Sequence, residues 1–155
     1  MAGAILRGAV LGAMAGAAGT TALNAVTYLD MAVRGRPVST VPERTIEVLA
    51  GRAVPGGEDT RGNRISGLAG LAGLSTGVAV GAVFGVLRVL GMRAGPASGA
   101  VVVGAAAMAA ADVPLVRLGI TDPRTWGVTG WLSDIVPHLA YGAVTAATLD
   151  ALDRP

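Results

Sequence analysis

The sequence predicts an all-α fold, a four-helix transmembrane bundle with a short amphipathic helix in the long loop between the first and second spans. Hydrophobic residues make up 52% of the 155 residues and charged residues only 14%, against about a quarter in typical soluble domains. Aromatic residues account for 3%, whereas glycine contributes 24 residues. Such a chain is too apolar to stay disordered and too poor in bulky side chains for an ordinary water-soluble core. We therefore expect a single membrane domain, residues 1–155.

Four stretches without charged residues define the spans, which we predict at about 8–29, 65–87, 94–116 and 134–152. A helix that crosses the hydrocarbon needs roughly 20 apolar residues, and the first two stretches supply them. The third stretch reaches that length only by continuing past Asp112. The fourth is too short unless Ala151 and Leu152 join it or Asp134 lies at the headgroup level. The first stretch also has features of a signal peptide, but its apolar run continues far beyond a cleavage site, so we interpret it as a span.

The polar connection 31–64 contains the predicted amphipathic helix. It begins with Thr40 as a cap, Pro42 in the first turn and Glu43 three residues after the threonine, and it ends at Gly51. This helix lies either on the membrane surface or against the bundle or its own loop.

The connection 119–133 holds two tryptophans between the third and fourth spans. Asp122 is expected to cap a short helix that starts with Pro123. Trp126 and Trp131 are typical of side chains that anchor a helix end at the membrane–water interface. With four spans both termini lie on one side, and more arginines flank the opposite side, which predicts that the long loop is cytoplasmic.

Glycine recurs at every fourth position in the first two spans, at Gly8, Gly12 and Gly16 and then at Gly73, Gly77, Gly81 and Gly85. This spacing puts the glycines on one face of each helix, where two backbones can approach closely in lipid. The faces serve either packing within one bundle or association with another copy or another membrane subunit.

Polar side chains gather on one side of the predicted membrane, because the first and third spans end there and the second and fourth begin there. The candidates for a polar site are Asn24, Asp30, Asp112, Asp134, His138 and Tyr141. Ionisable groups at membrane depth are costly and are therefore functional candidates.

Asp134 and His138 lie one helical turn apart. A carboxylate beside the one histidine of the chain can orient the imidazole and relay protons. Three interpretations stay open: a helix cap formed by Asp134 or Ser133 with an interfacial ion pair, a polar binding site, and a proton relay. Asp112 lies inside the third span if that span continues through Pro114, and at its end otherwise.

Several classes of chemistry find no support in the sequence. The chain has no cysteine and one histidine, a poor donor set for a metal site. Neither Ser39 nor Ser133 stands in a nucleophile motif, and no phosphate-binding loop occurs. The 12 basic and 10 acidic residues nearly balance, which argues against nucleic acid. We expect no enzyme activity, no cofactor and no metal; a membrane enzyme that handles a lipid or quinone stays open as an alternative.

Two segments carry a resemblance to known membrane proteins, the Pro-led helix Val41–Leu49 and the element Pro137–Gly142, of the form Pro-His-x3-Gly. Together with the order of a Gly-rich span, a polar connection and further spans, they resemble small bacterial integral membrane proteins of the actinobacterial type and, more distantly, the YagU-like family. The resemblance implies a multi-pass protein of the bacterial cytoplasmic membrane and carries over no catalytic residue.

The sequence therefore predicts an integral membrane protein without evident catalytic chemistry, with the lipid bilayer as its surroundings. We interpret it as a helix-packing or accessory component of a homo-oligomer or a larger membrane complex. The alternative is a small transporter or channel with a polar site at the layer of Asp112, Asp134 and His138.

Overall fold

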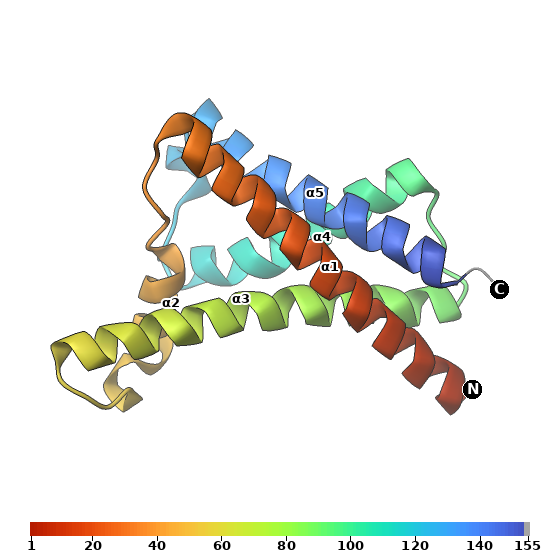
Figure 1. Cartoon of the computed structure of the whole chain (residues 1–155), viewed down its shortest axis with the longest axis horizontal. Coiled ribbons are helices and arrows are strands. Elements are labelled where there is room, and N and C mark those ends of the chain that lie inside the picture. The colour runs from red at the N-terminus through yellow and green to blue at the C-terminus, as the bar shows by residue number, and fades with distance from the viewer. Residues whose placement is uncertain (154–155) are drawn as a thin grey trace.

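The computed structural model describes residues 1–153, and this part of the chain is all-α. Four long helices pack together (Figure 1): α1 (Ala2–Arg34), α3 (Glu58–Val89), α4 (Pro96–Arg117) and α5 (Val128–Leu152). The short helix α2 (Val41–Ala50) lies between the first two, followed by the 3-10 turn η1 (Gly51–Ala53), and a second turn, η2 (Pro123–Thr125), precedes α5. The predicted architecture, with four long apolar helices and one short helix in the long loop, is confirmed.

The long helices are apolar on the outside of the bundle. Their most apolar segments have mean hydropathies from 1.2 to 1.9, yet no more than 33% of any such segment is buried. Leu71, Leu74 and Val101 are large apolar side chains with about half of their surface exposed. Soluble proteins rarely expose apolar surface so continuously, and each helix is long enough to cross a bilayer. The chain is a multi-pass integral membrane protein.

Helices α1 and α3 touch backbone to backbone along their glycine faces. The residues that meet there are Gly8, Gly12 and Gly16 from α1 and Gly77, Gly81 and Gly85 from α3. A Cβ added to Gly12 would come under 3.0 Å from backbone atoms of Gly81 and Gly85, closer than real Cβ contacts. In lipid no hydrophobic effect draws helices together, so the dispersion energy of this close contact holds them. These faces serve packing inside one chain.

Gly73 lies outside this contact, although it shares the four-residue spacing. A Cβ added there would meet nothing within 4 Å, and the same holds for Gly67 and Gly70. Helix α1 crosses α3 at an angle and then follows α5 (Figure 1). The two helices therefore separate before Gly73 is reached.

Helix α5 is held by close contacts on two sides. A Cβ at Gly19 of α1 would meet Tyr141 and Thr145 of α5, and a Cβ at Gly142 of α5 would meet the backbone of Gly104 of α4. Neither Gly19 nor Gly104 belongs to the series of fourth-position glycines. Small residues thus bring α5 close to both of its neighbours.

Tyr141 forms the centre of the core and is 1% exposed. Its phenol hydroxyl donates a 2.6 Å hydrogen bond to the main-chain oxygen of Gly77 in α3. Around its ring pack apolar side chains from the other three long helices, Leu23, Val80, Phe84, Val103 and Ala107. One aromatic side chain therefore joins all four long helices.

Helix α5 begins at Val128, earlier than the predicted start at Asp134. Gly127 is its N-cap residue, so the prediction that Asp134 or Ser133 caps the span is wrong. Trp126, just before the cap, stacks edge-on against Trp131 in the second turn, with ring centroids 5.2 Å apart. An apolar pair at these two positions is a hydrophobic staple, which fixes the entry of a helix. The staple starts the helix early and leaves Asp134 well inside it.

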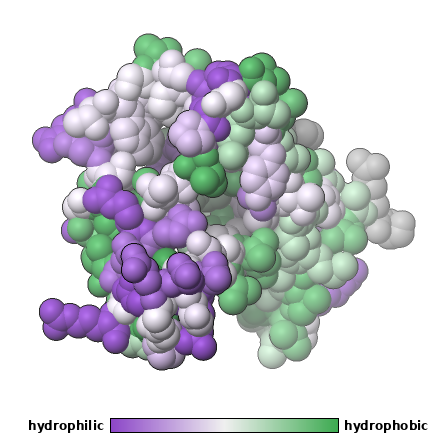
Figure 2. All heavy atoms as spheres, turned by 60° about the vertical axis from the view of Figure 1, so that its left-hand side comes forward, coloured by the Kyte–Doolittle hydropathy of each residue, from purple (hydrophilic) through white to green (hydrophobic). Residues whose placement is uncertain are grey.

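The two ends of the bundle differ in structure and polarity. The start of α1, the end of α5 and the turn between α3 and α4 lie at one end, here called the terminal end; α2, the end of α1 and the start of α5 lie at the other, the loop end (Figure 1). Hydrophilic side chains gather at the loop end, with apolar ones over the helices behind (Figure 2). Helix α2 packs against α3, which supports its docking on the bundle.

We predict opposite effects of the same substitution at two glycines of α3. Gly81→Ala forces a Cβ into the backbone of α1 and should destabilise the fold by about 1–3 kcal/mol. Gly73→Ala meets open space and should be neutral or stabilising by up to about 1 kcal/mol, because alanine favours helix. Unfolding in mixed detergent micelles, followed by circular dichroism, measures both. Equal effects of the two substitutions would contradict the α1–α3 contact.

Candidate functional site

Asp134 and His138 share one face of α5. Nδ1 of His138 lies 2.8 Å from the main-chain oxygen of Asp134 and 3.2 Å from its Oδ1. Both oxygens are acceptors, so Nδ1 carries a proton and donates it to them. Nε2 is then the ring atom that takes up or releases a proton. The two side chains are largely buried, 13% and 20% exposed.

Pro137 lies inside α5 directly before His138. Proline has no N–H, so the carbonyl of Ser133, one turn earlier, loses its helical donor. The side chain of His138 bonds to the next carbonyl along the chain, that of Asp134.

Asp112 of α4 completes the site. Helix α4 continues through Pro114 to Arg117, so Asp112 lies inside the helix, the first of the two predicted alternatives. Its carboxyl group lies beside that of Asp134, within reach of a shared proton. Oδ2 of Asp134 is buried and has no hydrogen-bond partner in the part of the chain that the structure describes. We call Asp112, Asp134 and His138 the Asp–His cluster.

The Asp–His cluster lies below the predicted membrane boundary. His138 follows Trp131 by two helical turns, about 10 Å at a rise of about 1.5 Å per residue. Trp131 is predicted to lie at the interface, and from that prediction we expect the imidazole in the apolar zone of the bilayer. Within residues 1–153, no group of three histidine, aspartate or glutamate side chains has the geometry to hold a metal ion.

A line of polar side chains continues from the cluster along α5. Tyr141 and Thr145 follow His138 at helical spacing on the same face, which points into the bundle. Tyr141 was predicted as part of the polar site, but its hydroxyl is bonded to Gly77 and not to the cluster. Thr145 is fully buried, and its Oγ1 has no hydrogen-bond partner among residues 1–153.

Asp30 belongs to a separate ion-pair group at the loop end. Its carboxylate accepts 2.5 Å hydrogen bonds from Nε of Arg34 and from Nε of Arg36. The hydroxyl of Ser133 in α5 contacts both Asp30 and Arg34. This group ties the end of α1 to α5, a structural role.

Asn24 lies closer to the cluster than Asp30 does. Helices α1 and α5 run antiparallel, and Asp30 lies beside Ser133, so the register puts Asn24 of α1 level with His138. Asn24 is half-buried there. Tyr28, one turn further along α1, is 62% exposed and faces away from the bundle.

The connection before α5 has the predicted cap. The carboxylate of Asp122 accepts hydrogen bonds from the main-chain N–H of Arg124 at 3.0 Å and from its Nε at 2.9 Å. The guanidinium lowers the pKa of the Asp122 carboxyl from its usual value. Trp126 donates from Nε1 to Oγ1 of Thr121 at 3.1 Å. The role of Trp126 and Trp131 as membrane anchors stays a prediction.

The sequence analysis missed two polar contributions of α5. Ser133 was considered only as a cap and as a nucleophile, although it lies in the ion-pair group of Asp30. Thr145 was not singled out, although it continues the spacing of His138 and Tyr141. Continuing the helical spacing of His138 and Tyr141 by one more turn would have predicted Thr145. The contact of Ser133 with Asp30 could not be predicted, because it depends on how α1 and α5 align.

Comparison with known proteins finds no match to this chain. No family model matches it, and neither a curated protein nor a solved structure matches it. The resemblance to the YagU-like family stays a prediction. The functional argument therefore starts from the chemistry of the site and not from the fold.

We predict that Tyr141→Phe destabilises the bundle by about 0.6–1.5 kcal/mol, because it removes the hydrogen bond to Gly77 and leaves the ring in place. Tyr28→Phe is the matched control, since that side chain is exposed and its loss of a hydroxyl should change little. Unfolding in mixed micelles measures both. Equal stabilities of the two variants would show that the interhelical hydrogen bond contributes nothing.

Proposed function

We propose that this protein is a small membrane transporter that moves protons, alone or coupled to a solute, with the Asp–His cluster as its proton-binding site. The observation that carries the proposal is the meeting of Asp112, Asp134 and His138 from two helices at a depth where ionisable groups are costly. Packing alone does not account for such a cluster, because apolar residues of similar volume often pack as well or better.

The cluster has the chemistry to exchange a proton without building up charge. Two neighbouring carboxyl groups in apolar surroundings avoid a double negative charge when they hold one proton between them. When Nε2 of His138 takes up a second proton, the bond from Nδ1 to Asp134 becomes an ion pair. The net charge of the cluster then changes from minus one to zero.

The polar line of α5 supports passage through the bundle. Tyr141 and Thr145 lie between the cluster and the terminal end, and a hydroxyl group both accepts and donates a proton. The buried Oγ1 of Thr145 has no other partner among the described residues.

The proposed role is non-catalytic and needs no cofactor. We also propose the bacterial cytoplasmic membrane as its location, as the resemblance implies. The four apolar helices support a multi-pass topology.

We predict that Asp134→Asn abolishes proton flux. The purified chain is reconstituted into liposomes that contain a pH-sensitive dye, and a potassium diffusion potential drives protons inward. The wild type should acidify the lumen faster than protein-free liposomes, and Asp134→Asn should fall to that background because the amide cannot take up a proton in its place. His138→Gln should lose flux as well.

Asp122→Asn is the matched control. Asp122 also carries a carboxylate and lies at the same end of the bundle as the cluster, but it belongs to the connection between α4 and α5, outside the spans. Its flux should equal that of the wild type. Absence of wild-type flux under a pH gradient, an electrical gradient and both together would overturn the proposal, provided that the protein in liposomes keeps its helical circular dichroism spectrum.

A second candidate function, an accessory component that packs against another membrane chain, is favoured by the first half of α3. This segment extends beyond the other long helices and packs against α2, with further hydrogen bonds to η1 and to the loop that precedes α3. Its glycines Gly67 and Gly70 have nothing within 4 Å, and Leu71 beside them is 60% exposed. Small residues let another helix approach closely. The α3 glycines that contact α1 are buried inside the chain and cannot bind a partner. The accessory hypothesis therefore rests on this first segment of α3.

The absence of cysteine from the chain makes this second hypothesis testable by single-cysteine cross-linking. Leu71→Cys in native membranes should form a cross-linked product when the segment touches a partner, and the mass of the product distinguishes a second copy from another polypeptide. Val101→Cys, on the exposed side of α4, is the control. Equal, background cross-linking at both positions would rule out a partner at this segment.

A further inference from the structure

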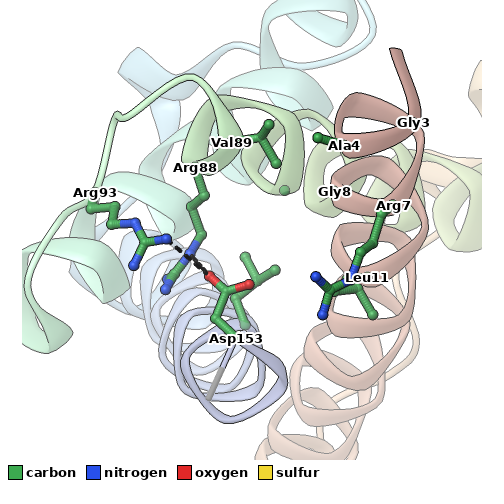
Figure 3. A pocket seen from close by; sticks show the side chains of 11 residues that line it. Gly3, Ala4, Arg7, Gly8, Leu11, Arg88, Val89, Arg93 and Asp153 are labelled. Atoms are coloured by element: carbon green, nitrogen blue, oxygen red, sulfur yellow. Dashed lines mark hydrogen bonds and ion pairs between the residues drawn. The ribbon is translucent and has the colours of Figure 1, made fainter. Parts of the chain in front are cut away.

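A cavity opens at the terminal end, the opposite end of the bundle from the Asp–His cluster. It has a volume of about 270 Å³ and lies between the start of α1 and the ends of α3 and α5 (Figure 3). Its charged lining consists of Arg7, Arg88, Arg93 and Asp153. Its apolar lining includes Leu11, Val89 and Leu149. A charged and an apolar wall thus meet in one cavity.

The arginines on the two sides of the cavity differ in how they are held. Arg88 is 14% exposed and is fixed by ion pairs to Asp150 at 2.7 Å and to Asp153 at 3.0 Å. Arg93 is 67% exposed and lies 4.0 Å from Asp153. Across the gap, Arg7 extends toward them from α1 (Figure 3). Its guanidinium forms no ion pair or hydrogen bond with any residue between positions 1 and 153.

Among residues 1–153, the charge balance of the cavity lining is positive. Three guanidinium groups face one lining carboxylate, and Asp150 outside the lining neutralises one more charge. Arginine binds phosphate oxygens through paired N–H groups, more specifically than lysine does. Arg88, held rigid by its carboxylates, and Arg7, which has hydrogen-bond capacity to spare, together suit a singly charged phosphodiester.

The place of the cavity indicates where the phosphodiester comes from. Arg88 stands at the last turn of α3 and Asp153 directly after α5, so the cavity lies where apolar spans end and lipid headgroups begin. Leu11 lies one turn further into the bundle than Arg7, and Leu149 one turn further than Asp153, so these two side chains line the part that leads toward the apolar zone. The volume is slightly below that of sites for whole small molecules, about 300–1,000 Å³, and therefore suits a headgroup whose acyl chains stay in the bilayer.

We propose that this cavity binds the phosphodiester headgroup of an anionic glycerophospholipid, with Arg7 and Arg93 closing on it from two sides and Arg88 fixed behind them. The bound lipid links α1 to the ends of α3 and α5, the place where the helices diverge. The site is separate from the Asp–His cluster and does not depend on the transport proposal.

Native mass spectrometry of the full chain, released from micelles, tests this proposal. The probes are phosphatidylglycerol, phosphatidylcholine of the same acyl chains, and inorganic phosphate. The wild type should retain one phosphatidylglycerol in preference to phosphatidylcholine. Arg7→Gln and Arg93→Gln should each weaken that retention by about fivefold, the contribution of about one arginine near an anionic surface. Arg7→Lys should keep part of it.

Arg117→Gln is the matched control, because Arg117 is an exposed arginine at the loop end, and it should retain phosphatidylglycerol as the wild type does. Equal retention of the two lipids, or equal retention by Arg7→Gln and Arg117→Gln, would overturn the site. Complete displacement of phosphatidylglycerol by inorganic phosphate at millimolar concentration would assign the cavity to free phosphate and overturn the lipid. All variants should keep the wild-type helical content, since Arg7 and Arg93 are exposed.

Discussion

The backbone contact between α1 and α3 is the constraint on which the rest of the structure depends. At Gly12 and Gly81 there is no side chain between the two helices, so their separation is set by the main chain itself. Because α3 lies this close, the carbonyl of Gly77 comes within reach of the Tyr141 hydroxyl. That hydrogen bond positions α5, and α5 presents Asp134 and His138 toward α4. The polar cluster is therefore held in place by contacts that do not involve its own side chains.

The Asp–His cluster and the cavity at the terminal end differ in their electrostatic chemistry. At the loop end, Asp112, Asp134 and His138 form a group in which protons can balance the charge without a permanent counter-ion. At the terminal end the charges are arginines, which stay charged under all physiological conditions, paired with carboxylates at the membrane boundary. A titratable group suits exchange of a proton, and a permanent cation suits a permanently charged headgroup.

Local patterns predicted the elements whose cause is local. The absence of charges over 65–87 predicted a segment that lies in lipid. Such a segment must be helical, because a helix satisfies its own backbone hydrogen bonds where no water is present. The interpretation of Asp134 or Ser133 as the cap of the last helix was wrong, because Asp134 is only the first charge before the apolar run and α5 begins earlier. The pairing of Trp126 with Trp131 across Gly127 begins the helix earlier, and both tryptophans were interpreted only as membrane anchors. A pair of tryptophans can act as a membrane anchor and as a hydrophobic staple, and their spacing in the sequence does not distinguish these two roles.

The sequence by itself determined that this is a membrane bundle, that glycine faces pack, and that Asp134 and His138 share a helix face. Each follows from composition or from the 3.6-residue period within one segment. Only the tertiary structure decided that Gly81 is in contact and Gly73 is not, that Tyr141 belongs to the core, and that Asp112 joins Asp134 from another helix. A repeat gives every turn of a helix the same face, whereas the crossing of two helices selects the few turns that touch.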